Sequence, residues 1–438
     1  MNKKNLLINI ILAILSTVFV YTGYFLFPVL IWIAFVPVIV LVKRITPKEN
    51  LIFASLISLF LWVSSVYCII NFDKKLAFLM ILYTASFVFF FFVILNFVFL
   101  KIKNNFVVFF PAILWVLLFE LYNSFKPTGS WFNLAYLQPR FSFVSQLVGE
   151  AGILFIIVLV NTLLVFAIVE KSRKRYLIPL LIIFLILLLA HVYGQNKETE
   201  GRRVRVAVIQ GNITQSWDWR VANSQSVILD KYIQLSRNAA MEKPDLIVWP
   251  EYAIPLDIEQ EKDVYSKISN LAKSLKVNLI IGSLSNVGTF STDGLTNYFD
   301  SAYAFDRNGG LIGRYDALHP FDYKTTTVAG EGYLVFKTDV GRIGIAICFD
   351  EVYNEIYHDY NKLGVDYFVT ISNNEPIKNQ RTMFWMKRIS ELRAATYGKY
   401  YVRSANTGFS QVVDPFGNVI NSIPYHKEGY MNTDIYIR

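Results

Sequence analysis

Two residues that could do covalent chemistry stand directly after apolar segments in the second half of this 438-residue chain. Cys348 closes an apolar stretch that begins at Ile343, and Glu251 follows the letters VWP at positions 248–250. A carboxylate beside a thiol can act as a general base and generate the nucleophilic thiolate. The pair therefore suggests acyl transfer through Cys348, with Glu251 as the base, if the fold brings the two side chains together.

A third segment, Tyr315–Asp322, reads YDALHPFD and adds aromatic and polar side chains. Taken singly, each of these features has a plain structural explanation. A cysteine that ends an apolar strand is usually a buried, unreactive side chain, and a glutamate after a strand is usually a solvated loop residue. The catalytic interpretation therefore rests on the three segments occurring together.

Alternating strands and helices should position these residues. Apolar residues recur at three- and four-residue spacing over 221–241 and 258–276, which predicts two helices. Short apolar runs predict buried strands at Val204–Gln210, Leu246–Trp249, Leu279–Gly282, Ala302–Phe305, Ile343–Cys348 and Tyr367–Ser372. This alternation predicts a layered α/β fold, in which side chains at the carboxyl ends of strands gather at the site.

The first half of the chain is far more apolar. Hydrophobic residues make up 54% of the sequence, and the excess over a soluble domain lies before residue 196. We therefore expect a membrane domain at 1–195 and an α/β domain at 196–438. Seven candidate membrane spans, the second of them short, lie at 5–24, 26–42, 51–71, 77–100, 105–122, 146–169 and 176–193.

The net charge of +9 comes largely from basic clusters between these spans. Such clusters orient a membrane protein and contact anionic lipid, so nucleic acid is not an expected partner. With a cytoplasmic N-terminus, the inner segments carry eleven Lys and Arg residues, and the outer loops carry four: Lys74, Lys75, Lys126 and Arg140. An odd number of spans then places the α/β domain on the outer face of the membrane.

The outer loop Asn123–Ser145, together with the start of the next span, holds an unusual set of polar and aromatic residues. Trp131, Gln138 and Glu150 could form an aromatic and polar belt at the membrane interface. They could also line a lipid-facing cavity and bind substrate. Position alone leaves both interpretations open.

Cysteine and histidine usage points to no structural metal or disulfide. Cys68 lies in an apolar run far from Cys348, which leaves Cys348 as a free thiol. His358 and His426 show no metal-ligand spacing with each other or with a cysteine. We expect neither a metal nor a cofactor.

Longer motifs around these residues resemble known families. The segments VAVIQGNI at 206–213, VWPEYAIP at 248–255, GRIGIAICFDE at 341–351, ISNN at 371–374 and VRSANTGFSQVVDPFGNVI at 402–420 resemble the carbon–nitrogen hydrolases of the nitrilase superfamily. In the membrane half, SWFNLAYLQ at 130–138, QLVGEAG at 146–152 and Asn161 resemble the apolipoprotein N-acyltransferases of bacterial envelopes.

The resemblance implies an αββα sandwich with a Glu–Lys–Cys catalytic triad. Glu251 would be the general base, and Cys348 would accept an acyl chain from a phospholipid as a thioester. The amine of a diacylglyceryl-cysteine at a lipoprotein N-terminus would then take the chain. The resemblance also implies that Asn373, Asn374 and Asn406 lie near bound substrate, and that the protein is a multi-pass protein of the bacterial cytoplasmic (inner) membrane with a periplasmic catalytic domain.

The triad lysine is missing from the matching position. The family's pattern resembles Tyr-x-Lys-x-His, and here the lysine position is Ala317. The lysine would stabilise the oxyanion of the tetrahedral intermediate, so this chain should be inactive or impaired. An engineered replacement, a natural loss of activity and compensation by a neighbour such as Lys324 are three explanations, and the intact Glu251 and Cys348 favour the first.

Other departures leave the acceptor open. The polar segment 375–380 (EPIKNQ) stands where the acyltransferases usually have a Trp-Phe-Gly-type lid, and the family's extra carboxylate has only Asp322 or Glu331 as candidates. The same triad would also serve a membrane-tethered amidase or nitrilase that transfers the acyl group to water. A protein that binds lipid or lipopeptide without catalysis is the third alternative.

Overall fold

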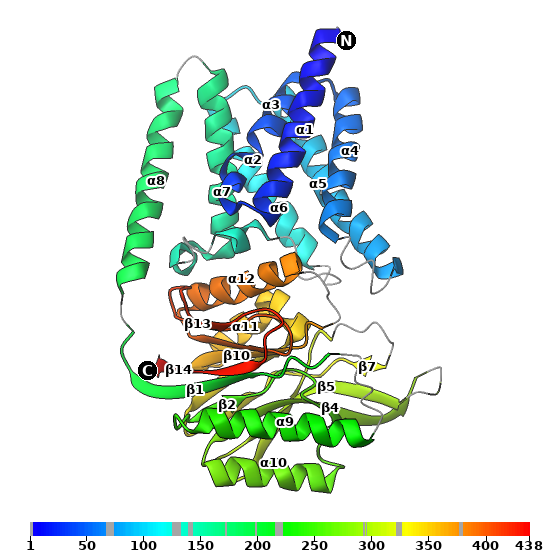
Figure 1. The fold of residues 1–438 in the computed structure, drawn as a ribbon. Helices are drawn as coiled ribbons and strands as arrows, with labels where there is room; N and C mark the ends of the chain where they lie inside the picture. The colour runs from blue at the N-terminus through cyan, green and yellow to red at the C-terminus, as the bar shows by residue number, and fades with distance from the viewer. Residues whose placement is uncertain are drawn as a thin grey trace. The chain divides into compact units, whose positions relative to one another are not determined.

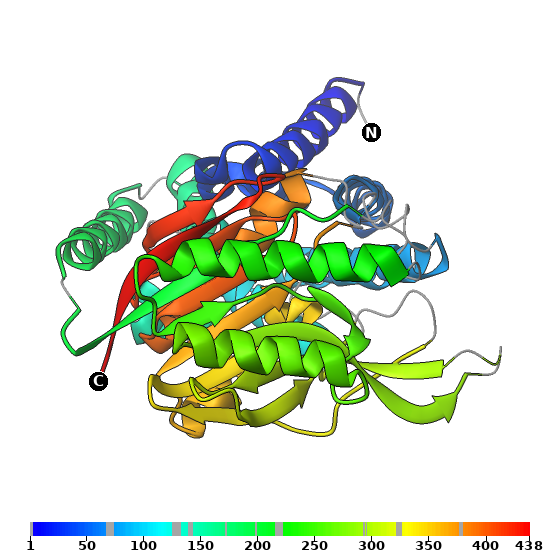
Figure 2. The same cartoon turned by 60° about the horizontal axis from the view of Figure 1, so that its bottom comes forward.

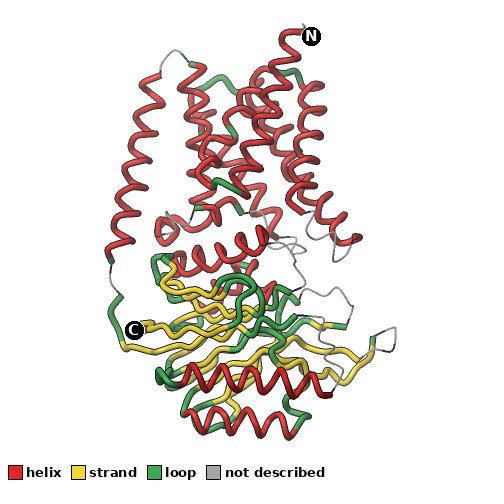
Figure 3. The backbone as a smooth tube through the Cα atoms, viewed as in Figure 1, coloured by secondary structure: helices red, strands yellow, loops and turns green. Residues whose placement is uncertain are grey.

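The computed structural model describes residues 3–66, 74–124, 133–138, 143–170, 173–197, 199–214, 222–291, 294, 296–320, 326–375 and 380–438. The chain forms two compact units, Met1–Gly194 and Gln195–Arg438, coloured blue to green and green to red in Figure 1. Helices make up the N-terminal unit, whereas strands dominate the interior of the C-terminal unit (Figure 3).

The N-terminal unit consists mainly of apolar helices. Its longer helices are α1 (Lys3–Phe25), α3 (Val36–Arg44), α4 (Pro47–Val66), α5 (Lys74–Lys101), α6 (Phe110–Ser124), α7 (Ser145–Val169) and α8 (Arg173–Asn196). By length and hydropathy, four stretches of the described residues could each cross a membrane, namely Lys3–Tyr24, Ile81–Lys101, Ser145–Val169 and Arg173–Asn196. The number of seven spans stays a prediction.

The second apolar stretch of the sequence is broken rather than continuous. It forms a 3-10 turn η1 (Pro28–Leu30), the single turn α2 (Ile31–Ala34) and then α3. Asn161 of α7 accepts a hydrogen bond from the Phe35 N–H at 2.9 Å and donates one to the Ile31 carbonyl at 3.0 Å. Because no water reaches the middle of a bilayer, these bonds satisfy backbone groups that the break leaves without helical partners.

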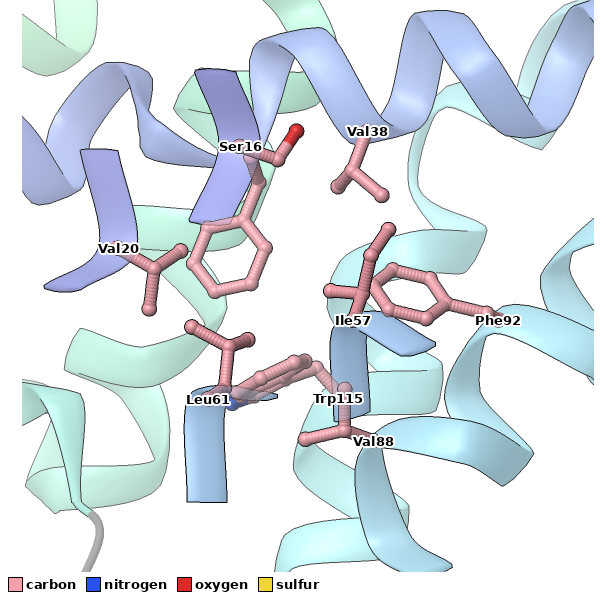
Figure 4. Close-up of a pocket in the computed structure, with 9 residues that line it drawn as sticks. Ser16, Val20, Val38, Ile57, Leu61, Val88, Phe92 and Trp115 are labelled. Atoms are coloured by element: carbon pink, nitrogen blue, oxygen red, sulfur yellow. The ribbon is translucent and has the colours of Figure 1, made fainter. Parts of the chain in front are cut away.

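Aromatic packing fills the centre of the N-terminal unit. The Trp115 ring of α6 meets the rings of Phe35, Phe87 and Phe91 edge-on, with centroids 4.9 Å apart in each case. A small cavity beside Trp115 is lined almost entirely by apolar side chains, such as Val20 and Val38 (Figure 4). Apolar side chains thus surround Trp115, whereas buried polar side chains such as Asn96 and Asn161 bond to backbone carbonyls elsewhere in the unit.

Two β-sheets form the centre of the C-terminal unit. The first has the strand order β14-β1-β2-β4-β5-β6, and β3 and β7 pair with β4 and β5 beside that path. Its strands are β1 (Arg202–Gln210), β2 (Leu246–Val248), β3 (Ile254–Asp257), β4 (Asn278–Phe290), β5 (Thr296–Phe305), β6 (Leu311–Asp316), β7 (Thr327–Val328) and β14 (Gly429–Ile437). The second sheet has the order β13-β12-β11-β10-β9-β8. Its strands are β8 (Val335–Thr338), β9 (Gly341–Ile347), β10 (Tyr367–Ser372), β11 (Tyr401–Ala405), β12 (Ser410–Val413) and β13 (Val419–Ile423).

The sheets face each other, and helices cover their outer faces. The helices α9 (Ala222–Ala240) and α10 (Lys262–Leu275) pack on the first sheet (Figure 2). The helices α11 (Asn354–Lys362) and α12 (Gln380–Tyr397) contact the second sheet. Between the sheets, the Ser404 hydroxyl donates to the carbonyls of Ile209 at 2.8 Å and Val248 at 3.3 Å. This is the predicted αββα sandwich of a nitrilase-like fold.

The six predicted strands and both predicted helices are confirmed, with differences at their ends. Trp249 lies just beyond β2, and Cys348 lies just beyond β9, as the first residue of the 3-10 turn η6 (Cys348–Val352). Both catalytic candidates thus follow the carboxyl ends of strands that are parallel to a neighbour in their sheet. That is where an α/β fold gathers its functional side chains.

Candidate active site

Glu251 is held in a tight turn after β2. Trp249, two residues earlier, is fully buried, stacks on Tyr232 with centroids 5.1 Å apart and donates from its indole N–H to the Ser236 hydroxyl at 2.8 Å. Strand β4 passes so close to this turn that a Cβ atom at Gly282 would lie 2.5 Å from the Glu251 Cα. The turn is therefore fixed on both sides, and only 5% of Glu251 is exposed.

Cys348 stands in a left-handed backbone conformation where β9 turns into η6. Its φ of 48° is uncommon for a residue other than glycine, and such strain is retained where the surrounding structure holds it. The Ser372 hydroxyl, at the end of the neighbouring strand β10, donates to the Cys348 sulfur at 3.7 Å. The residue Cys348 as a whole is only partly buried.

The structure brings Glu251 and Cys348 together. The Cys348 thiol and the Glu251 carboxyl are hydrogen-bonded side chain to side chain. The backbone N–H of Asn373, directly after β10, donates a short hydrogen bond to the same carboxyl. A carboxylate so oriented toward a thiol has the geometry that a general base needs.

Ala317 lies directly after the end of β6 and beside Asp300 of β5. Its side chain is 1% exposed, its N–H donates to the Asp300 carbonyl at 2.8 Å, and its carbonyl accepts from the Gly330 N–H at 2.8 Å. The lysine position suggested by the resemblance is thus buried beside the Glu251 cluster, and it contributes a methyl group only. A long cationic side chain is absent from this position.

Asp300 of β5 completes the cluster and was not among the predicted residues. It is hydrogen-bonded to the Glu251 side chain and is 4% exposed. One sequence signal could have found it, since a carboxylate in the strand FDSAYAF interrupts an otherwise apolar and small-residue run. Its contact with Glu251 could not be predicted, because that contact depends on the sheet register, which cannot be read from the sequence.

Burial and mutual repulsion hold protons on this cluster. Burial, together with the adjacent Glu251 charge, raises the pKa of Asp300 well above its usual range. Burial likewise raises the pKa of Glu251, although hydrogen bonds from its neighbours offset part of the effect. Burial and then the charge of Glu251 raise the pKa of the Cys348 thiol. None of the main influences on these three pKa values comes from a lysine or arginine in the described part of the chain.

Asp350 ties the Cys348 turn to the segment that carries Ala317. Its carboxyl accepts hydrogen bonds from the Tyr315 hydroxyl at 2.8 Å, the His319 N–H at 2.8 Å and the Ile347 N–H at 3.1 Å. Burial raises the pKa of Asp350 to about 6, and these hydrogen bonds limit the shift. Asp350 therefore positions the site rather than reacting in it.

The predicted asparagines hold one another and the backbone. Asn406 donates to the Asn373 side chain at 3.1 Å and exchanges two hydrogen bonds with the Ile213 backbone at 2.8 Å. Asn374 accepts from Arg403 at 3.3 Å. These contacts support the Asn373 N–H that binds Glu251, which favours a positioning role. Direct contact of the three asparagines with substrate stays a prediction.

A buried ion pair lies beneath the Cys348 turn. The Arg403 guanidinium of β11 donates two hydrogen bonds of 3.0 Å to the Glu351 carboxylate of η6, and both side chains are 1% exposed or less. A bidentate pair of this kind fixes geometry as well as charge. It holds the turn against the second sheet.

The predicted lipid-facing residues lie in the N-terminal unit. Gln138 accepts from the Trp32 indole at 2.7 Å, and Glu150 accepts from Asn133 at 2.9 Å. Both are buried, and Glu150 follows a break in α7 at Gly149, whose φ is 68°. Trp131 lies outside the described residues, so the substrate-binding role of the three stays a prediction.

The remaining candidates near Ala317 are not part of the described cluster. Asp322 and Lys324 lie outside the described residues, and Glu331 is exposed. Among the described residues, no group of three or more His, Cys, Asp or Glu side chains could hold a metal ion.

Two family models match the chain, one in each unit. The Carbon-nitrogen hydrolase model matches residues 205–437, and the model of the Apolipoprotein N-acyltransferase N-terminal domain matches residues 12–163. A crystal structure of a carbon-nitrogen hydrolase from Helicobacter pylori G27 is similar with a TM-score of 0.45 and 18% identity, over 53% of this chain and 89% of that one.

Curated relatives align across both units. An apolipoprotein N-acyltransferase of Geobacter metallireducens is 30% identical over 356 residues, which cover 74% of this chain and 67% of that relative. An apolipoprotein N-acyltransferase of Shewanella oneidensis is 27% identical over 354 residues, with the same two coverages. These matches, with the sandwich fold and the family model in each unit, show that the chain belongs to the apolipoprotein N-acyltransferase family and carries a carbon–nitrogen hydrolase domain.

Proposed function

We propose that the site transfers a fatty acyl chain from a phospholipid to the N-terminal amine of a diacylglyceryl-cysteine lipoprotein, with Cys348 as the nucleophile. The observation that supports it is the Glu251–Cys348 hydrogen bond at the ends of two strands, in a chain that also carries the family's membrane domain. Splitting the transfer into two steps lowers the barrier of each.

In the first step, Glu251 takes the thiol proton, and the Cys348 sulfur attacks the ester carbonyl of the phospholipid. The C–S bond forms, the C–O bond breaks, and Glu251 returns the proton to the departing lysophospholipid oxygen. In the second step, the lipoprotein amine attacks the thioester. The C–N bond forms, the C–S bond breaks, and Glu251 accepts the amine proton and passes it back to the thiolate.

We further propose that Ala317 leaves this chain impaired. A lysine here would place an ammonium group among Glu251, Asp300 and the developing oxyanion. Without it, burial and the charge of Glu251 raise the pKa of Cys348, which favours the thiol over the thiolate. Losing one oxyanion donor typically lowers the rate by about 10²–10³. Glu251 and Cys348 match the other two positions of the family's triad, which supports the loss of the lysine alone.

The partners follow from the same proposal. The donor is a phospholipid, the acceptor is a lipoprotein N-terminus, and both are held in a membrane. The asymmetry of Lys and Arg between alternate loops supports a cytoplasmic N-terminus and a C-terminal unit on the periplasmic face of the inner membrane.

Two alternatives use the same residues. An amidase would give the acyl group to water, and a lipid or lipopeptide binder would use no chemistry at all. The membrane domain favours lipid acyl transfer over hydrolysis of a soluble amide, whereas Ala317 is the observation that favours a binder.

Our first prediction concerns Ala317→Lys. The full-length variant, purified in detergent and incubated with phospholipid, should form a fatty-acyl adduct on Cys348 about 100-fold faster than the unmodified chain, because the ammonium supplies the missing oxyanion donor. Mass spectrometry of the Cys348 peptide measures the adduct. Ala317→Met adds length without charge and serves as the matched control.

Transfer to a diacylglyceryl-cysteine peptide then separates the alternatives. N-acylation of the peptide by the Ala317→Lys variant supports the acyltransferase. An adduct that is released only to water points to the hydrolase. Equal turnover of the unmodified chain and Ala317→Lys would contradict the impairment, and no adduct in either would contradict the acyl-enzyme.

A further inference from the structure

Sheet register places an acidic side chain directly across from Ala317. Strands β5 and β6 are antiparallel with Ser301 opposite Asp316, and the Ala317 N–H bonds to the Asp300 carbonyl at 2.8 Å. Ala317 and Asp300 are therefore opposite each other. Side chains in such a pair lie on the same face with Cβ atoms about 4.5–5.5 Å apart. The Asp300 carboxyl thus stands beside the Ala317 methyl group.

Within the described part of the chain, one oxygen of that carboxyl has no hydrogen-bond partner. Asp300 is 4% exposed, and its Oδ1 atom is buried without a hydrogen-bond partner. Buried polar atoms are nearly always paired, and a buried carboxylate without a cation is costly. The nearby buried cation Arg403 is already engaged by Glu351. Asp300 Oδ1 is therefore an acceptor without a donor, next to the side chain at position 317.

We infer that the space bounded by Ala317, Asp300 and Glu251 is a binding site for an external primary alkylammonium ion. An ammonium group carries three donors and no acceptor, which suits the unpartnered Asp300 Oδ1 and the adjacent Glu251 carboxyl. Charge-assisted hydrogen bonds of this kind are about twice as strong as neutral ones.

The Ala317 methyl group sets the length of the ligand. Relative to lysine, alanine lacks three methylene groups and the ammonium. In lysine the rest of the side chain is covalently bonded to Cβ, whereas a free amine can only make van der Waals contact with the Ala317 methyl group. A free amine of the same length therefore needs more room than a lysine side chain. Ethylammonium and propylammonium should therefore fit better than butylammonium. The same ammonium chemistry could come from a small free amine or from the N-terminus of a lipopeptide.

A bound ammonium would change the reactivity of Cys348. It would offset the charges of Glu251 and Asp300, and a cation within about 4–6 Å favours the charged form of an acid by about 1–3 pKa units. More thiolate would then be present at neutral pH, and the thiolate is the form that alkylating reagents attack. This consequence requires no acyl donor and does not rest on the proposed transfer reaction.

The test measures alkylation of Cys348 by iodoacetamide in the full-length chain, followed by mass spectrometry of the Cys348 peptide. Ethylammonium and propylammonium chloride should raise the rate about tenfold and saturably at neutral pH, where these amines are protonated. Sodium chloride controls for ionic strength, propanol for size without charge, and tetramethylammonium for charge without N–H donors. Asp300→Asn should abolish the saturable rise.

A second measurement protects the test against a poorly folded variant. The thermal midpoint of the unmodified chain should rise with ethylammonium concentration, because a ligand that binds only the folded state stabilises it. Ala317→Met, which fills the space, should remove this rise. An acceleration equal to that by tetramethylammonium, an equal effect in Asp300→Asn, or no saturable effect on either readout would overturn the inference.

Repeating the alkylation assay with lipopeptides identifies the source of the ammonium group. A diacylglyceryl-cysteine peptide with a free N-terminus, compared with its N-acetylated form, should reproduce the acceleration if the acceptor itself fills the site. Acceleration by the small amines alone supports a site for free amines. Failure of acyl transfer in the Ala317→Lys variant would leave these binding readouts untouched, so the two proposals fail separately.

Discussion

Charge around Cys348 determines whether its thiol can react. Three buried carboxyls, Glu251, Asp300 and Asp350, lie in or beside the site, and burial raises the pKa of each. A lysine at position 317 would offset part of that charge, whereas alanine leaves the carboxyls to repel one another. Proton retention by Asp300 is one physical reason for the impairment that we propose.

The second prediction concerns the pH dependence of stability through Asp300. A carboxyl with a higher pKa in the folded chain binds protons more tightly there, so the free energy of unfolding falls as pH rises above its unfolded pKa. The loss begins near the ordinary aspartate value of 3.8. Because burial raises the pKa of Asp300 in the folded chain, the unmodified chain should lose stability relative to Asp300→Asn as the pH rises above about 4, by about 1.4 kcal/mol for each unit of pKa difference between the two states.

Thermal unfolding of the two full-length proteins across this pH range measures the difference. Exposed Asp263, replaced by asparagine, is the control and should follow the unmodified chain at every pH. Parallel pH profiles of the unmodified chain and Asp300→Asn would show that Asp300 is charged at the same pH in both the folded and unfolded states.

The site was only partly predictable at the residue scale. Glu251 and Cys348 could be found because each comes directly after an apolar strand, and Ala317 because the surrounding letters fix its place in a motif. Asp300 stands out only as a carboxylate within an apolar strand, and its contact with Glu251 could not be predicted, because that contact depends on which strands pair and in which register. Order along the chain identifies the residue that ends each strand, but not the residue that lies opposite on another strand.

Close packing of β4 against the Glu251 turn matters at the element scale. A Cβ atom at Gly282 would lie 2.3 Å from the Pro250 carbonyl oxygen and 2.5 Å from the Glu251 Cα, both of them backbone atoms that cannot rotate away. The third prediction is that Gly282→Ala displaces the turn, costs about 1–3 kcal/mol as overpacking does, and slows alkylation of Cys348.

Gly332→Ala is the matched control, because nothing lies within 4 Å of a Cβ atom there. Denaturant unfolding gives the stability change, and iodoacetamide kinetics gives the reactivity. Equal behaviour of the two variants would mean that β4 can move aside without disturbing Glu251.

The buried ion pair between β11 and η6 gives the fourth prediction. Arg403→Met removes the guanidinium and leaves the Glu351 carboxylate buried without its partner. Such a loss typically costs about 3–5 kcal/mol, whereas an exposed pair contributes about 0–1 kcal/mol. Lys362→Met breaks the exposed pair with Asp359 and serves as the control. Denaturant unfolding that shifts equally in both variants would contradict the structural role of Arg403.

Secondary structure was more predictable than the details of its ends. Apolar runs and periodicity identified six strands and two helices of the sandwich, because these elements bury one face or one stripe, whereas the other strands and the helices α11 and α12 were not predicted. The left-handed φ of Cys348 and the break of α7 at Gly149 have no periodic signal. The Cys348 turn depends on tertiary contacts, such as the hydrogen bond that the Asp350 carboxyl accepts from the His319 N–H. Exact termini therefore required the structure.

At the scale of the whole molecule, the number of membrane spans decides where the C-terminal unit works. Four described helices are long and apolar enough to cross a bilayer. The broken segment around α2 and α3 and the shorter helix α6 decide whether the total is odd. With a cytoplasmic N-terminus, an odd number puts the catalytic cysteine outside the cytoplasm, where a lipoprotein N-terminus would be presented, and an even number puts it inside.

The fifth prediction tests this topology with single cysteines in a Cys68→Ser, Cys348→Ser background. Met241 is 82% exposed in the C-terminal unit, and Lys103 is exposed in the segment between α5 and α6. In intact bacterial cells, a membrane-impermeant maleimide should label Met241→Cys after the outer membrane is made permeable. Lys103→Cys should be labelled only once the inner membrane is also opened. Seven spans require this pattern, because four of them precede Lys103 and three come after it. Protection of Met241→Cys until the inner membrane is opened would place the unit in the cytoplasm, where the proposed transfer to an exported lipoprotein could not take place.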